Sequence, residues 1–234
     1  DDQKFTTANP ENKLQEEKGE DEPKSSDRGF SEPNLRARWQ KQDRSPGMFT
    51  LSLIITSVAV FLLSGMGGNK QIIDNFLISA QPPYLNEILN GQFWRLFTPI
   101  FIHSDPIHIL FNMYWLHILG SQIEKLKGSK FFITFVLALA LFSNLAQFLM
   151  SGPSFGGMSG VVYGLFGYVF IKCKFDPGDG FRIDMFIANV MFAWFILCFL
   201  GVFGNVANWA HAGGLLVGLA WGYGSALRWN RGKK

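Results

Sequence analysis

The sequence has 234 residues, a formal net charge of +3 and 48% apolar residues. Residues 1–47 hold 20 of the 39 charged side chains, whereas residues 48–234 hold almost all of the Phe and Trp. A soluble domain spreads its charges over its surface, so this pattern excludes an ordinary soluble protein and predicts a membrane protein with a polar tail. Basic runs interleaved with aromatic residues are missing, so we expect no nucleic-acid partner.

Residues 1–47 mix both signs of charge with Pro and Ser and contain few aromatic residues. Such a composition cannot bury enough apolar surface to fold, so we expect a disordered, charged cytoplasmic tail or linker. The first residue is Asp rather than Met. We therefore expect a fragment or a processed form, with a missing cytoplasmic domain before the tail as one explanation.

Six apolar runs follow, each close to the roughly 20 residues that a helix needs to cross a bilayer. They cover about 48–65, 107–123, 130–150, 159–175, 184–203 and 205–227. Backbone groups in lipid must bond to one another, so each run is predicted to be a helix. The expected fold is all-α: a polytopic membrane protein with one six-helix domain over residues 48–228 and a short basic C-terminus over residues 229–234.

The basic residues alternate between the connections. The tail, the second and fourth gaps and the C-terminus contain Arg36, Arg38, Lys41, Arg44, Lys125, Lys127, Lys130, Lys172, Lys174, Arg182, Arg228, Arg231, Lys233 and Lys234, whereas the third and fifth gaps contain none. By the positive-inside rule, both termini face the cytoplasm. The first connection, about 65–105, is rich in large apolar groups, so we expect a folded, partly embedded element on the outer side.

Ser159 lies in the stretch "SGPSFGGMSGVVYG", at the start of the fourth run. The first turn of a helix has unpaired N–H groups, which are suitable donors for an oxyanion next to a nucleophile. Gly157 and Gly160 would allow a sharp turn and a close approach to a bound peptide. The alternative is a Ser that caps a glycine-rich packing helix.

His211, Gly214 and Gly218 lie at positions i, i+3 and i+7 of the sixth run, on one helical face. The small residues favour close contact with a neighbouring helix at the depth of Ser159, so a Ser–His pair is predicted. Tyr163, one turn below Ser159, is placed to stack on the imidazole. The alternative is a His that only hydrogen-bonds between helices.

His108 and Asn112 lie at i and i+4 near the outer end of the second run and share a face. Both side chains can donate hydrogen bonds to a developing oxyanion. The alternative is a capping His and a polar packing Asn. His103 falls in the first connection, beside the predicted membrane surface.

Together these stretches resemble the rhomboid intramembrane serine proteases, most closely their bacterial GlpG-like branch, over about residues 48–228. The matching motifs are GxSG at Gly157-Met158-Ser159-Gly160, AHxxGxxxG at Ala210-His211 with Gly214 and Gly218, HxxxN at His108 and Asn112, and the loop signature Trp94-Arg95.

The resemblance implies a six-helix rhomboid bundle in a bacterial inner membrane with its active site open to the periplasm. It implies a serine endopeptidase that cleaves transmembrane segments of membrane proteins near the periplasmic surface, with no metal or cofactor. Ser159 would be the nucleophile and His211 the general base, then acid. The oxyanion donors would be His108, Asn112 and the Ser159 N–H, with Tyr163 supporting the histidine. Its partners would be membrane-protein substrates and lipids.

Two other functions fit parts of the pattern. A transporter or channel would also place His and Asn within spans, but it usually shows internal repeats and polar groups at mid-membrane depth. A catalytically silent relative would bind membrane helices without cutting them, although every motif position is intact here. The HExxH pattern of a metalloprotease is missing from the sequence.

Overall fold

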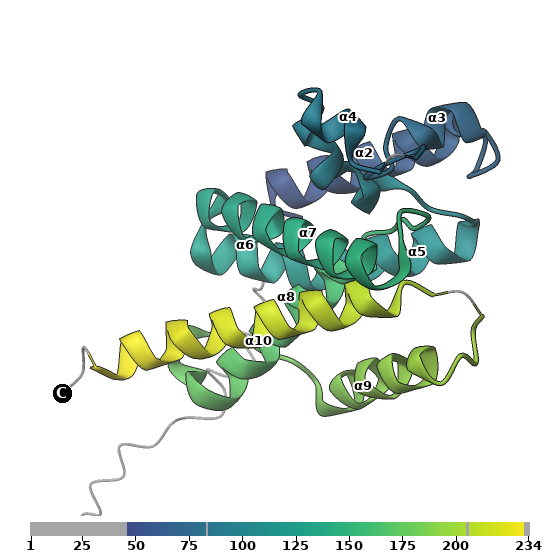
Figure 1. The fold of residues 1–234 in the computed structure, drawn as a ribbon. Helices are drawn as coiled ribbons and strands as arrows, with labels where there is room; N and C mark the ends of the chain where they lie inside the picture. Colours follow the sequence, from purple (N-terminus) through teal and green to yellow (C-terminus); the bar gives the residue numbers. More distant parts are fainter. Residues whose placement is uncertain (1–45, 83, 205, 232–234) are drawn as a thin grey trace, which may run out of the picture. The chain divides into compact units, whose positions relative to one another are not determined.

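The computed structural model describes residues 46–82, 84–204 and 206–231, and within these ranges every regular element is helical (Figure 1). The prediction of an all-α fold is therefore confirmed for the described part of the chain. Apart from residues 46 and 47, the predicted charged tail lies outside the described residues. So do residues 232–234 of the predicted basic C-terminus.

Helices occupy all six predicted apolar runs. They are α2 (Met48–Leu63), α5 with η4 and α6 (Pro106–Trp115, Leu116–Gly120 and Ser121–Lys127), α7 (Ser129–Ser151), α8 (Ser159–Phe175), α9 (Met185–Phe199) and α10 (Asn208–Arg231). Among the described residues, α7 alone is both long enough and apolar enough to cross a bilayer. The helices α2 and α9 are apolar but shorter. The number of membrane crossings therefore stays a prediction.

The first connection contains four short helical pieces: α3 (Lys70–Asp74), α4 (Asn86–Leu89), η2 (Phe93–Leu96) and η3 (Thr98–Phe101). Arg95 is only 6% exposed and donates hydrogen bonds to the carbonyl oxygens of Asp74 and Leu77, at 2.7 and 2.9 Å. A guanidinium offers several donors in a fixed plane, so one side chain can hold two turns of backbone. The connection is thus an ordered element.

Glu124 of α6 fixes the start of α2. Its carboxylate accepts hydrogen bonds from the N–H groups of Phe49 and Thr50, at 2.9 and 2.8 Å, and from the hydroxyl of Ser129 at 2.7 Å. The first N–H groups of a helix have no partner within the helix, and their positive end favours a carboxylate. Glu124 therefore caps α2 from a distant part of the sequence, because the N-cap residue Gly47 has no side chain that could accept these hydrogen bonds.

The two glycine-lined helices α8 and α10 pack against each other, with α10 in front of α8 in the view of Figure 1. A methyl group added at Gly214 would overlap the carbonyl oxygen of Gly160, and one added at Gly218 would overlap that of Gly164. The two backbones therefore touch, as small residues at i and i+4 permit. Most of α8 is buried as a result.

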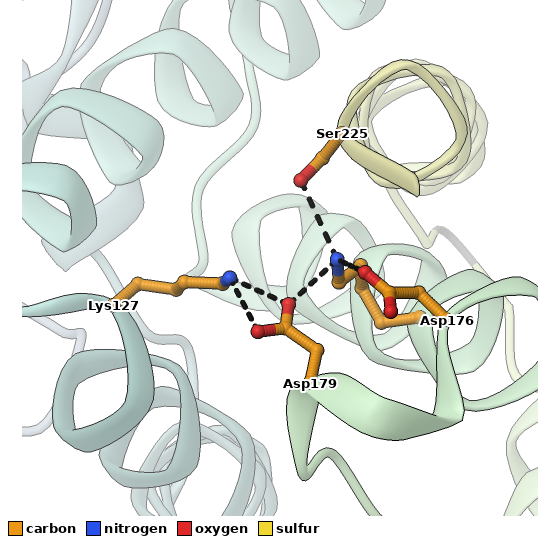
Figure 2. Close-up of polar contacts among 5 residues, drawn as sticks. Lys127, Asp176, Asp179 and Ser225 are labelled. Carbon is orange, nitrogen blue, oxygen red and sulfur yellow. Dashed lines mark hydrogen bonds and ion pairs between the residues drawn. The ribbon is translucent and has the colours of Figure 1, made fainter. Parts of the chain in front are cut away.

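A buried ion network closes the end of α8 that is opposite to Ser159 (Figure 2). Lys172 is 1% exposed and forms ion pairs with Asp176 and Asp179, and its ammonium also reaches the Ser225 hydroxyl of α10 at 3.5 Å. Asp179 in turn binds Lys127 of α6 at 2.5 Å. The network joins three helices to the segment 176–184 that leads into α9.

Asp179 is ionised in this network. Burial opposes its charge, but hydrogen bonds and ion pairs from Lys127 and Lys172 outweigh burial and hold its pKa below the ordinary value. A carboxyl group with a lowered pKa stabilises the folded state above its unfolded pKa, and this contribution is lost as the pH falls through the folded value.

Replacing Lys172 with Met should destabilise the fold, because two carboxylates would lose the ammonium that neutralises them. Breaking a buried ion pair on one side typically costs about 3–5 kcal/mol, and since Asp179 is partly exposed we expect the lower end. Thermal unfolding in detergent, followed by a dye that reacts with the chain's two cysteines, measures the loss. Lys174→Met, at an exposed position of the same helix, is the control. Equal melting of both variants would contradict the role of the network.

Candidate active site

The turn before α8 places the hydroxyl of Ser159. Gly157 has φ = +128°, a backbone conformation that side chains disfavour, and its N–H donates to the Pro99 carbonyl at 3.0 Å. Met158 is fully buried, and Ser159 then begins the helix half-buried. The hydroxyl therefore lies at a helix N-terminus whose first N–H groups have no partner within the helix.

The imidazole of His211 lies next to this hydroxyl. Its Nε2 is 2.8 Å from Ser159 Oγ, and the residue is only 3% exposed. The other ring nitrogen, Nδ1, is buried without a hydrogen-bond partner in the part of the chain that the structure describes. The structure thus brings together the predicted pair from α8 and α10.

Packing orients the histidine ring. The Tyr163 ring lies 4.7 Å from the His211 ring, centroid to centroid, at an interplanar angle of 40°. The Tyr163 hydroxyl donates to the carbonyl oxygen of Met191 in α9, at 3.2 Å. The tyrosine is therefore held on one side by α9 and covers one face of the imidazole on the other.

His108 and Asn112 share a face of α5, as the sequence predicted. The Asn112 amide donates one hydrogen bond to the His108 carbonyl oxygen at 2.9 Å, which leaves its second N–H. His108 Nε2 faces Gly157: a methyl group added there would lie 2.8 Å from Nε2 and 3.7 Å from Ser159 Oγ. The small space beside Gly157 is thus bordered by groups from α5 and α8.

His103 is a site residue that the sequence did not reveal. It is 1% exposed, and its ring centroid lies 5.0 Å from that of His108, while its expected position beside the membrane surface stays a prediction. Burial, and then the neighbouring His108, lower the pKa of His103 to about 3, so its ring is neutral. Its Nδ1 is 3.1 Å from the Phe101 carbonyl, and the Met158 N–H points at its Nε2 from 3.5 Å.

Gln147 of α7 is the second residue that the sequence reasoning missed. Its side-chain oxygen accepts hydrogen bonds from the N–H groups of Trp209 and Ala210, at 3.0 and 3.1 Å, although 62 and 63 residues separate the partners. It therefore caps the first turn of α10, directly before His211. The sequence feature that could have identified Gln147 is its polar amide within an otherwise apolar run.

The comparison with known families decides the family of the chain. The model of the Rhomboid domain matches residues 90–228, a range that contains all of the site residues described above. The chain belongs to the rhomboid family. Rhomboids are integral membrane proteins, and this chain is therefore one as well.

Three curated relatives of this rhomboid chain are each called rhomboid protease GlpG. They come from Enterobacter sp. (strain 638) and from two strains of Klebsiella pneumoniae, ATCC 700721 / MGH 78578 and 342. Each is 36% identical over 182 residues, which cover 77% of this chain and 64% of the relative. The aligned part thus spans less than two thirds of the relatives' length.

No group of three or more His, Cys, Asp or Glu side chains that could hold a metal ion occurs among the described residues.

Replacing Gln147 with Leu should destabilise the start of α10. Two buried N–H groups would lose their acceptor, and an unsatisfied buried donor costs about 1–3 kcal/mol. Gln147→Glu keeps an acceptor oxygen for both N–H groups at the helix N-terminus, so it should lose less stability than Gln147→Leu despite the cost of burying a carboxyl group. Thermal unfolding in detergent compares the two variants. A Leu variant that melts like the Glu variant would show that this cap contributes nothing.

Proposed function

We propose that this protein is an intramembrane serine endopeptidase that cleaves transmembrane segments of membrane proteins with Ser159 and His211. The observation that carries the proposal is the 2.8 Å contact between the hydroxyl and the imidazole at the N-terminus of a buried helix. Membership of the rhomboid family and three relatives that are named proteases support the same activity.

The proposed reaction follows from these positions. His211 Nε2 takes the hydroxyl proton of Ser159 as Oγ attacks the scissile carbonyl carbon, and the carbonyl oxygen becomes an oxyanion. The proton then passes from Nε2 to the leaving amine, which gives an acyl-enzyme. Water, deprotonated by the same nitrogen, hydrolyses this ester and regenerates the serine.

The negative charge of the oxyanion would be stabilised by hydrogen-bond donors around Gly157. The N–H of Ser159, the second N–H of the Asn112 amide and the His108 ring are the candidates. Tyr163 and the close helix contact would orient His211 in place of a carboxylate. In the usual triad that carboxylate holds the imidazole in the correct tautomer, so catalysis without it should be slow.

The proposed setting is a bacterial inner membrane, with six crossings and both termini in the cytoplasm. The alternation of basic residues supports this orientation, which directs the Ser159 end of α8 toward the periplasm. The connection 64–105 would lie partly embedded on that side. The substrate would be a membrane-protein helix that contains Gly or Pro near the scissile bond, because such residues reduce the work of unwinding it into the site.

Ser159→Ala and His211→Ala should each lower cleavage of a transmembrane reporter by at least about 1,000-fold, because each removes one member of the reacting pair. The assay uses purified protein in detergent or liposomes and separates the products by electrophoresis. Ser154→Ala is the matched control, since Ser154 is an exposed serine in the loop before the same helix. Cleavage that persists in Ser159→Ala would contradict the assignment.

A fluorophosphonate probe separates this proposal from a transporter or channel. A serine activated by an imidazole forms a covalent phosphonate ester, whereas an ordinary packing serine does not react. We expect mass spectrometry to find the adduct on Ser159 and none in His211→Ala. A protein that remains unlabelled at full probe excess would favour a transporter, a channel or a catalytically silent relative that only binds helices.

A further inference from the structure

A chain of polar contacts leads from the surface to the ring of His108. Asp105 is the N-cap of α5, and its carboxylate accepts the His108 N–H and the Ser104 hydroxyl, each at 2.8 Å. The Ser104 oxygen is in turn 3.2 Å from His108 Nδ1. Ser104 and Asp105 are exposed, whereas His108 is half-buried. A carboxylate, a hydroxyl and an imidazole are thus connected in sequence.

The opposite edge of the ring faces the nucleophile. His108 Nε2 borders the space beside Gly157 that Ser159 Oγ also borders. Nδ1 is therefore the nitrogen turned toward Ser104, and Nε2 is the nitrogen presented to a reacting carbonyl. Nδ1 would thus hold the ring in position, and Nε2 would contact the substrate.

The hydrogen bond from Ser104 to Asp105 favours a proton on His108 Nδ1. A carboxylate only accepts hydrogen bonds, so the Ser104 hydroxyl donates its single hydrogen to Asp105. The lone pairs of Ser104 then face His108 Nδ1, and this contact is attractive only when Nδ1 carries a proton. The backbone N–H of Ser104 also points at Nδ1, but at 3.5 Å it lies beyond the usual range.

An Nδ1 proton has a consequence for catalysis. In a neutral ring with its proton on Nδ1, Nε2 has no hydrogen and cannot donate to an oxyanion. Nε2 donates only when the ring carries both protons. The His108 ring must therefore be positively charged in the step that it assists. Burial of the ring opposes that charge, and the nearby negative charge of Asp105 favours it.

The charges that face the ring are few. Asp105 supplies a negative charge from the N-cap, and hydrogen bonds from the His108 N–H and then from Ser104 hold its pKa below the ordinary value. His103 packs against the ring and is neutral. His211 of α10 is the other titratable group that interacts electrostatically with His108, and it must be neutral to act as a base.

This inference rests on the proposed function. We propose that Asp105 and Ser104 are positioning residues that hold His108 Nδ1 and stabilise the doubly protonated ring, so that Nε2 can donate to the oxyanion. The alkaline limit of cleavage then reports the loss of a proton from His108.

Asp105→Asn tests the proposal with little change to the fold, because Asn is as good an N-cap as Asp. We expect the alkaline limb of kcat/KM for the transmembrane reporter to move to lower pH by roughly half a unit, as for a screened surface charge. His108→Gln carries an amide near the position of Nε2 and donates at every pH. In that background Asp105→Asn should leave the pH profile unchanged. A uniform loss of activity at all pH values, or a shift of equal size in both backgrounds, would overturn the proposal.

A second measurement does not depend on cleavage and so separates failure of this inference from failure of the proposed function. Nitrogen-15 NMR of histidine-labelled protein, with Ser159→Ala to prevent turnover, distinguishes protonated from bare ring nitrogens. We expect the neutral His108 ring to carry its proton on Nδ1, and Ser104→Ala to reduce that preference. A neutral ring protonated on Nε2 would overturn the proposal even if the protein is a protease.

Discussion

The contact on which the site depends is that between the backbones of α8 and α10. Gly160 faces Gly214, and Gly164 faces Gly218, with no room for a methyl group at either position of α10. Apolar lipid offers little hydrophobic driving force between helices, so close packing of small residues is what holds them together. Because Ser159 is next to Gly160 and His211 lies one turn before Gly214, the same contact sets the distance between hydroxyl and imidazole.

In the proposed mechanism, packing orients the imidazole in place of the charged third residue of many serine hydrolases. A carboxylate beside the imidazole would have to be buried here, and burial of a charge is unfavourable unless it is well paired. The Tyr163 ring covers the imidazole, and the Gln147 amide fixes the backbone before it. Both act through neutral groups. At the other end of α8, the buried charge of Lys172 is paired with two carboxylates.

Local periodicity explains how much the sequence could predict. The spacing of His211, Gly214 and Gly218 defines one helical face, and the i, i+4 spacing of His108 and Asn112 defines another, whatever surrounds them. Gln147 and His103 were missed because their partners lie 62 and 55 residues away. Helical periodicity relates only residues that are a few positions apart, so it cannot predict such contacts. Lys172 and Asp179 are close in the sequence, but their pairing was missed because the turn after α8, which folds Asp179 back toward the helix, has no helical periodicity. The number of membrane crossings depends on how the helices lie in the bilayer, and the periodicity of the sequence does not determine that arrangement.

The rate at which a fluorophosphonate labels Ser159 in Gly214→Val and Gly224→Val tests the central claim most directly. Both glycines lie on α10, but a Cβ atom added at Gly224 meets nothing within 4 Å, whereas one added at Gly214 overlaps the backbone of α8. If the helix contact activates the serine, Gly224→Val should react like the unmodified protein and Gly214→Val should react at least about 100-fold more slowly, which corresponds to at least about 2.7 kcal/mol. Equal rates for two folded variants would contradict the account.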